Sequence, residues 1–320
     1  MQKTFIKYSS LITICAVFAI ITAVLIGSHV ARAAQATVDL KSATPFAILS
    51  GTPSITDAGN ASVITGNVGL SPATGAGIGL LCAQVTGAIY STDATGPLPC
   101  RETNGPLMVT AKNDLTAAYD DAAGRTPLTT VPTELGGTRL VAGVYDSSST
   151  TLNITAGAGA LVLDGQNDPS SVFIFQAPFN GTGLTVGSGS TVSLINGAQA
   201  CNVFWRVDTA SIDTTATFVG TILALNSISV ANGATIEGRL LARNGNVTLI
   251  NDRITVPTCS DGTTDGEGEN GGEGAGAGII PGFPNTGSQA TDAVLIGAVV
   301  LLLAALGSLA VYGIHKKRSA

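Results

Sequence analysis

The chain has 320 residues, of which 11% are charged and 40 are glycine, and its formal net charge is -6. This composition is unusual for a cytosolic enzyme and is typical of a strand-rich exported domain. Lys and Arg form no cluster outside the two ends of the chain. Because binding of phosphates needs clustered cations, the composition excludes nucleic acid as a partner.

The N-terminus predicts a cleaved secretory signal peptide over residues 1–33. Lys3 and Lys7 precede an uncharged apolar stretch from Leu11 to Gly27, and Ala31-Arg32-Ala33 offers the small residues that a signal peptidase accepts. The alternative is a retained N-terminal anchor. Both interpretations place the rest of the chain outside the cytoplasm.

Residues 34–259 are expected to form one mainly β domain. Short apolar runs such as Val172-Phe173-Ile174-Phe175 and Val203-Phe204-Trp205 are bounded by Gly, Asn, Ser and Asp, which is typical of strands and turns. The apolar setting of Trp205 favours a place in the core. One helix is expected over Val109–Ala123, with Gly124 able to end it.

A short repeat predicts that the strands stack as coils. Residues 218–224 (FVGTILA) and 236–242 (IEGRLLA) are similar at an offset of 18, and a turn and a short polar strand follow each segment. Such a short period is typical of a solenoid, in which each coil buries its apolar side against its neighbours. We expect Arg206 and Arg239 to be solvated or paired at the edge of a coil.

Inward and outward residues must alternate along the strand that follows each turn. The expected inward residues are apolar: Leu152, Leu184, Ile212, Ile228 and Val247. The expected outward residues are small and, except for Asp213, uncharged: Thr150, Thr151, Asn153, Thr182, Gly183, Thr185, Ser211, Asp213, Asn226, Ser227, Ser229, Asn246 and Thr248. A flat row of stiff hydroxyl and methyl groups can order water. These residues can equally be ordinary polar residues of soluble strands.

Several segments resemble the microbial ice-binding proteins that have a discontinuous β-solenoid. The resemblance covers residues 37–258 and includes ITGNVGLSP from Ile64, AAYDDAAGR from Ala117, NVFWRV from Asn202 and GRLLA from Gly238. It implies a right-handed discontinuous β-solenoid of triangular cross-section with one long α-helix packed alongside. It also implies a monomer without cofactor or metal that binds the surface of ice crystals through one flat face.

Some members of that family carry Thr, Ala or Gly, any residue, then Thr or Asn on the ice-binding face. Thr182-Gly183-Leu184-Thr185 matches this motif, whereas the other coils keep the alternation but not the residues. The resemblance therefore implies an ice-binding surface protein, with the outward residues named above as its site. The alternative is an adhesin that uses the same scaffold to bind a polymer or a host ligand.

Five cysteines become four if Cys15 leaves with the signal peptide, and an even number in an exported chain favours disulfides. Cys82 and Cys100 bracket one loop, while Cys201 and Cys259 would tie an early coil to the end of the domain. We favour these two pairs, although the other two connectivities are also compatible with the sequence.

The C-terminal part predicts attachment to the cell surface. Residues 260–282 are rich in Gly, Glu and Asp and are expected to form a flexible linker. Residues 293–314 carry no charge and are long enough to span a membrane, and the basic residues 315–320 would lie in the cytoplasm.

Between the linker and this apolar stretch, residues 283–287 (FPNTG) resemble the sortase sorting signal of Gram-positive surface proteins, with Phe283 where Leu is usual and Pro284, Asn285, Thr286 and Gly287 in register. That resemblance implies cleavage by sortase between Thr286 and Gly287 and linkage of Thr286 to peptidoglycan. A plain membrane anchor is the alternative.

Catalysis finds little support in the sequence. His29 and His315 both lie outside the expected domain, so it can form neither a Ser-His-Asp triad nor a His-ligated zinc site. Asp208 and Asp213 are the nearest candidates for a carboxylate pair of the kind that glycosidases use. Both are better explained as turn and surface residues. We therefore expect a protein that is not an enzyme.

Overall fold

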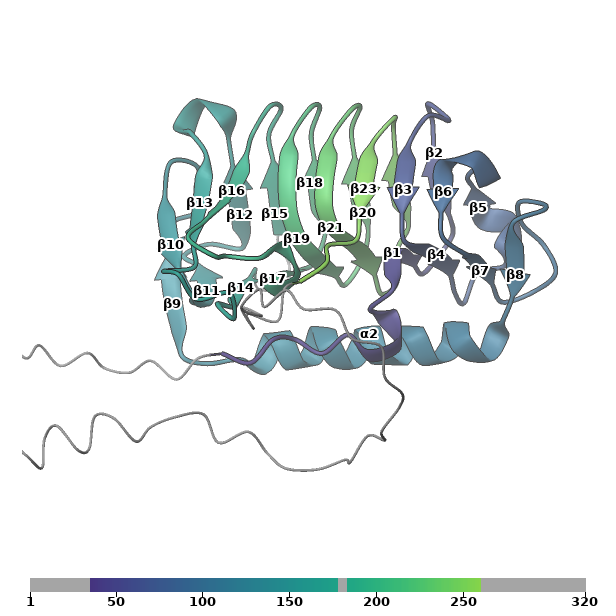
Figure 1. The fold of residues 1–320 in the computed structure, drawn as a ribbon, viewed down its shortest axis with the longest axis horizontal. Coiled ribbons are helices and arrows are strands. Elements are labelled where there is room, and N and C mark those ends of the chain that lie inside the picture. The colour runs from purple at the N-terminus through teal and green to yellow at the C-terminus, as the bar shows by residue number, and fades with distance from the viewer. Residues whose placement is uncertain (1–34, 178–182, 260–320) are drawn as a thin grey trace, which may run out of the picture. The chain divides into compact units, whose positions relative to one another are not determined.

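The structure is a computed structural model that describes residues 35–177 and 183–259. The chain divides into two compact units, and every described residue belongs to the first, Met1–Thr264. The described residues are mainly parallel strands with one long helix, α2 (Gly105–Gly124), which confirms the expected mainly β class (Figure 1). The predicted signal peptide, linker, sorting motif, membrane span and basic tail lie outside the described residues, as does Thr182.

The strands form three faces, and the helix covers one of them (Figure 1). On this helix-covered face the neighbouring strands are β9 (Leu128–Val131), β11 (Gly143–Ser147), β14 (Phe173–Gln176), β17 (Val203–Val207), β19 (Thr217–Ala224), β21 (Thr235–Ala242), β1 (Phe46–Ser50), β4 (Asn67–Leu70), β7 (Ile89–Ser91) and β8 (Arg101–Thr103). Each pair is parallel, so every strand adds one layer to the stack.

The second face, called here the seven-stranded face, has the order β12 (Thr151–Ile154), β15 (Gly183–Val186), β18 (Ala210–Ile212), β20 (Ile228–Val230), β22 (Val247–Leu249), β2 (Ile55–Asp57) and β5 (Ile78–Gly79). The third face contains β10 (Arg139–Val141), β13 (Leu161–Asp164), β16 (Val192–Ile195), the first halves of β19 and β21, β23 (Arg253–Thr255), β3 (Val63–Thr65) and β6 (Val85–Thr86).

Short 3-10 turns complete the described elements: η1 (Lys41–Ala43), η2 (Gly75–Gly77), η3 (Cys82–Gln84), η4 (Ala156–Ala158) and η5 (Ala200–Asn202).

The stack does not follow the order of the sequence. The described chain enters in the middle, where β1 pairs with β21, and builds coils toward one end at β8. Helix α2 then runs back along the stack to the other end, where β9 begins a second series of coils that returns to the middle (Figure 1). The N-terminal and C-terminal coils therefore share one core.

The expected repeat appears as strand pairing. Phe218 pairs with Ile236 and Ala224 with Ala242, as the offset of 18 predicts. Strands β19 and β21 each continue from the third face to the helix-covered face through a glycine. Gly220 has a φ of +112°, and a Cβ on Gly238 would lie 1.9 Å from the Gly220 carbonyl oxygen. Only glycine fits this close approach of two coils.

Inside the coils, aromatic rings stack from layer to layer. Phe175 lies on Trp205 with a centroid distance of 4.0 Å, and Tyr145 and Phe218 extend the stack at 5.4 and 5.3 Å. The Trp205 indole N–H donates to the Val219 carbonyl at 3.0 Å. The prediction that Trp205 belongs to the core is confirmed, because its side chain is fully buried.

Helix α2 begins four residues before the expected start. Asn104 caps it by accepting the Leu107 N–H at 3.1 Å, and Pro106 occupies its first turn. Its buried side chains, among them Met108, Leu115 and Tyr119, pack on the outer surface of the helix-covered face. This packing explains why the residues on both sides of strands such as β1, β14 and β17 are buried.

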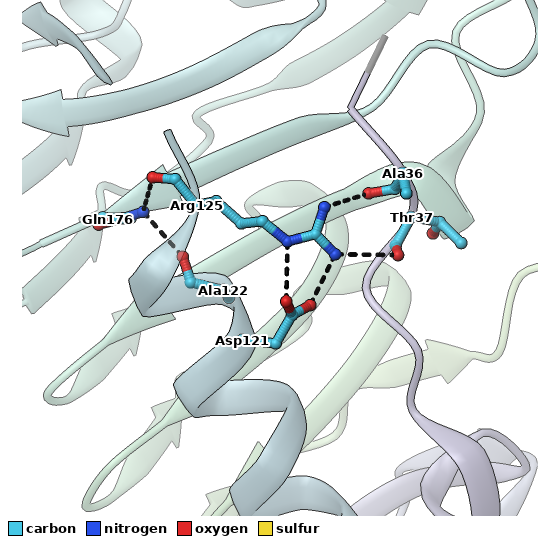
Figure 2. A network of polar contacts seen from close by, with 6 residues as sticks. All are labelled: Ala36, Thr37, Asp121, Ala122, Arg125 and Gln176. Atoms are coloured by element: carbon cyan, nitrogen blue, oxygen red, sulfur yellow. Dashed lines mark hydrogen bonds and ion pairs between the residues drawn. The ribbon is translucent and has the colours of Figure 1, made fainter. Parts of the chain in front are cut away.

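The C-terminal end of α2 is held by a network of polar contacts around Arg125 and Gln176 (Figure 2). Gln176 of β14 donates to the Ala122 carbonyl at 2.7 Å, which satisfies an acceptor at the helix end. Arg125 pairs with Asp121 at 2.7 Å and donates to the carbonyls of Ala36 and Thr37. The first described residues are thereby fixed beside the helix. The helix ends at Gly124, as expected, although the φ of Gly124 is not positive.

Arg206 and Arg239 were expected to be solvated or paired at the edge of a coil. They have partners but are neither solvated nor at an edge, because α2 and the segment before β1 cover them. Arg239 is 4% exposed and donates to the Thr44 carbonyl at 2.8 Å. Burial lowers its pKa to about 10. Arg206 is 7% exposed, and its guanidinium lies 4.6 Å from the centre of the Tyr119 ring. Both cations are desolvated within the interface between helix and sheet.

Two disulfides, Cys82–Cys100 and Cys201–Cys259, are present, and they are the pairs that we favoured. The first joins η3 to the loop before β8 at one end of the stack, and the second joins η5 to the last described residue. Within residues 35–177 and 183–259, no helix combines the length and the apolar character needed to cross a membrane. The described strands, α2 and both disulfides lie within 35–259.

Candidate functional site

The seven-stranded face presents small polar residues to solvent on a fully apolar support. The inward residues Leu152, Leu184, Ile212, Ile228 and Val247, which the sequence predicted, are all fully buried. Alternation along each strand then places the intervening residues on the outer surface. The backing layer is rigid because each inward side chain packs inside the coil core.

One row of outward residues runs without interruption across the whole face. Strand pairing aligns them directly with one another in the order Asn153, Thr185, Ser211, Ser229, Thr248, Thr56 and Gly79. Neighbouring strands in a sheet are about 4.8 Å apart, so the row repeats at that spacing. We call it the central row; none of its members is charged.

Thr56 and Gly79 are the members of the central row that sequence reasoning missed. They belong to β2 and β5, which precede α2 in the chain, and Thr56 pairs with Thr248 although 192 residues separate them. A signal was present, because Ser54-Ile55-Thr56 has the same alternation as Asn246-Val247-Thr248. The position of β2 in the stack depends on distant parts of the chain. Helix α2 carries the chain to the other end, and the later coils return until β22 pairs with β2.

The hydroxyls of the central row remain available to water. Within the described part of the chain, the side chains of Thr185, Ser211 and Thr56 form no hydrogen bond, and all three residues are exposed. Thr248 donates to Ser229 at 3.2 Å, which fixes these two hydroxyls relative to each other. The row therefore combines free hydroxyls with β-branched stems that have few rotamers.

A second row beside it is less regular. Thr151 pairs with Gly183, and Ser227 donates to the Asn246 side chain at 2.8 Å. Gly183 is buried with a φ of +69°, and a Cβ there would lie 2.1 Å from the Thr209 carbonyl oxygen. The predicted site residue Gly183 thus contributes a gap in this row, not a contact group.

Three predicted residues lie at the margins of the face. Thr150 is exposed just before β12. Asn226 donates to the Asp208 carboxylate at 2.6 Å in the corner that leads into β20. Asp213 follows β18, and the backbone N–H of Thr214 lowers the pKa of its carboxyl. Its negative charge is therefore confined to the edge of the face. Thr182 lies outside the described residues.

The structure also places the two carboxylates considered for catalysis. Asp208 lies before β18 and Asp213 after it, so the two residues occupy opposite ends of one strand. Asp208 is engaged by Asn226, and Asp213 accepts the backbone N–H of Thr214 at 2.8 Å. They do not face a shared reaction centre, and turn contacts account for both.

The third face differs from the seven-stranded face in charge. Its exposed residues include Arg139, Glu237 and Arg253, and Arg139 pairs with Asp164. Charged groups hold hydration shells of their own and move on long flexible stems. Of the two uncovered faces, the seven-stranded one is the more uniform and the more nearly neutral.

Comparisons with known proteins point to one family. The model of the family described as "Ice-binding-like" matches residues 48–255. An ice-binding protein from Colwellia sp is 41% identical over 238 residues, which cover 73% of this chain and 89% of that protein. An ice-binding protein from Flavobacterium frigoris is 41% identical over 224 residues, covering 69% of this chain and 76% of that one.

Solved structures agree in fold. An ice-binding protein domain from Shewanella frigidimarina has a TM-score of 0.62 and 29% identity, covering 70% of this chain and 99% of that chain. An ice-binding protein from an Antarctic biological consortium has a TM-score of 0.59 and 37% identity, covering 70% and 93%. The family match over residues 48–255 includes both series of coils.

Proposed function

Since the chain belongs to the ice-binding-like family, we propose that its domain adsorbs to ice through the seven-stranded face. The central row carries this proposal, because it is an in-register line of hydroxyl, amide and methyl groups across six of the seven strands and ends at Gly79 of β5. The site comprises the outward residues predicted above, without Gly183 as a contact group, and is extended by Thr56.

Adsorption follows from the ordering of water at this row. Water beside a flexible charged group is held by that group's own field, whereas water beside fixed hydroxyls and methyls takes its positions from a rigid template. The buried inward residues beneath the row pack tightly and keep the strands from moving relative to one another. The spacing of the row therefore determines the positions of the bound water. A surface that already orders water loses less entropy when it meets ice.

The proposed function needs no cofactor and no bond-making step. Restriction of ice growth, inhibition of recrystallisation and attachment to ice all follow from the same adsorption. Which of these three effects results depends on whether the ice-bound domain is free in solution or joined to a cell.

The test is an ice recrystallisation assay with a fragment of residues 35–259. The wild-type fragment is expected to keep ice crystals small at concentrations where albumin does not. Thr185→Tyr places a ring in the centre of the row and should remove most of this effect without unfolding the protein, because Thr185 is exposed. A wild-type fragment without any effect on ice would contradict the proposed function.

We also propose that the mature protein is displayed on the cell wall. Support comes from the sequence alone: the signal-peptide pattern of residues 1–33, the linker 260–282, the FPNTG motif, the apolar stretch 293–314 and the basic residues 315–320. Sortase and peptidoglycan are then the partners. Muramidase should release the wild-type protein from a sortase-bearing host, whereas Thr286→Ala should remain with the membrane fraction. Equal release of both would exclude wall linkage.

A further inference from the structure

The described chain ends on the side of the stack opposite the seven-stranded face. In each coil the chain runs from the helix-covered face to the seven-stranded face and then to the third face, as in β17, β18 and β19. The corner between the third and helix-covered faces is therefore the one that the seven-stranded face does not touch. Turn η5, which contains Cys201, lies at this corner because it joins β16 to β17.

The last described segment follows the same corner. After β23, the Val256 N–H donates to the Thr65 carbonyl at 3.0 Å, which places Val256 where β3 turns into β4. From there the last described residues run along the stack from β23 toward β17 (Figure 1). Cys259, at their end, is bonded to Cys201. Cys259 is thus held at the corner that the seven-stranded face does not touch.

Without the disulfide, this segment would be weakly held against a pull on residues beyond 259. Strand β23 is three residues long, and it pairs with β21 and β3 over only those residues. A force along the C-terminal chain would act on these few hydrogen bonds one after another. Peeling of a strand end in this way needs little force, because the bonds are not loaded together.

The disulfide changes where the force enters. A pull on Cys259 passes through the bond between the sulfurs to Cys201, which leads into β17. Strand β17 lies inside the sheet and pairs with β14 on one side and β19 on the other. Its side chains include Trp205, which is fixed in the aromatic stack. Force therefore reaches the five-residue strand β17 and its aromatic stack instead of the three-residue strand β23.

From this geometry we propose that the Cys201–Cys259 disulfide is a mechanical clamp that lets the domain hold ice under tension. The proposal rests on the proposed ice binding. Bulk ice is bound on the seven-stranded face, and the pulling force is applied through the chain attached at Cys259, at the opposite corner. The domain is then an ice adhesin, in which the seven-stranded face meets the crystal while the tether pulls away from it.

Single-molecule pulling without ice tests the clamp. The 35–259 domain is held by a handle after Cys259 and by a second handle on the thiol of Ser229→Cys, which is exposed on the seven-stranded face. The parent protein should unfold without an early step. Cys201→Ser with Cys259→Ser should add a low-force step of roughly 2 nm, the length of residues 253–259 when extended.

Two controls keep the interpretation specific. Cys82→Ser with Cys100→Ser removes the other disulfide, which joins η3 to the loop before β8 and lies outside the path of the force, so no early step should appear. Ile254→Ala weakens the packing of β23 and should lower the force of the early step only when Cys201 and Cys259 are serine. These comparisons do not depend on one variant folding perfectly.

Identical traces with and without the Cys201–Cys259 bond would overturn the clamp. Loss of ice activity in the wild-type recrystallisation assay would instead overturn the proposed function, so the two failures are distinguishable. Beads that carry the domain through its C-terminal handle should also stay on ice under flow. Detachment of the beads bearing Cys201→Ser and Cys259→Ser at lower flow is the expected result, and equal retention would contradict the proposal.

Discussion

Two glycines on the seven-stranded face should respond in opposite ways to substitution by threonine. Gly79 ends the central row and Gly183 interrupts the neighbouring one. A Cβ at Gly79 would lie 3.3 Å from the Ile55 carbonyl oxygen, a tight but tolerable contact, and its φ is not positive. At Gly183 the same atom would lie 2.1 Å from the Thr209 oxygen, on a backbone with a φ of +69°.

The magnitudes follow from these contacts. Threonine is favoured over glycine in a strand by roughly 1 kcal/mol, and the contact with Ile55 offsets part of this, so Gly79→Thr should change stability by about 0 to +1 kcal/mol. Gly183→Thr should destabilise the folded state by about 1–2 kcal/mol because of the left-handed backbone. Displacing Thr209 should destabilise it by about 1–3 kcal/mol more. The two melting temperatures should therefore differ by roughly 10 °C in a domain of this size.

Thermal unfolding followed by circular dichroism, with urea titration as a second probe, measures this difference. Gly79→Thr also lengthens the central row by one hydroxyl and should preserve or increase activity in the recrystallisation assay. Equal melting temperatures for the two variants would refute the reasoning, since that would mean that the backbone at Gly183 is not constrained as described.

Two further variants test other parts of the stack. Asp252 is 2% exposed, and burial, reinforced by the nearby Asp57, raises the pKa of its carboxyl from 3.8 to about 6. Between pH 3.8 and about 6 the folded state therefore binds more protons than the unfolded state. The contribution of Asp252 to stability is present below pH 3.8, and about 1–3 kcal/mol of it is lost as pH rises through 6. Asp252→Asn should flatten the urea stability profile between pH 4 and 6, and an unchanged slope would exclude Asp252 as its source. Thr215 has a φ of 57° at the position that Gly233 occupies one coil later, with a φ of 77°. Thr215→Gly should raise stability by about 0.5 kcal/mol, because relief of roughly 1–2 kcal/mol of strain exceeds the added flexibility of the unfolded chain. Gly233→Ala should lower the melting temperature, and a change of the same sign in both variants would contradict this account.

Local patterns in the sequence determined much of the fold. The offset between Phe218 and Ile236 gave the register of β19 on β21, because adjacent coils of one repeat must align equivalent residues. The alternation around Leu184 and Ile228 gave the outward residues of their strands. The earlier start of α2 could also have been predicted, since Asn is a favoured N-cap residue and Pro is favoured in the first turn of a helix, as Asn104 and Pro106 are here.

Features that depend on distant parts of the chain could not be predicted in the same way. Thr56 enters the central row because β2 inserts between β22 and β5, and no local pattern specifies that order. Arg206 and Arg239 resemble edge residues until α2 and the segment before β1 are placed over them. The gap at Gly183 depends on the position of the Thr209 carbonyl in the next coil.

The central claim is that the seven-stranded face, and not another surface, meets ice. A fluorescently labelled 35–259 domain offered to a growing ice hemisphere measures adsorption directly. Wild type and Thr235→Tyr, which places the same ring on the exposed third face, should both be incorporated, whereas Thr185→Tyr and Thr56→Tyr should be largely excluded. Incorporation of Thr185→Tyr and Thr56→Tyr at the wild-type level, or exclusion of Thr235→Tyr alone, would contradict the account.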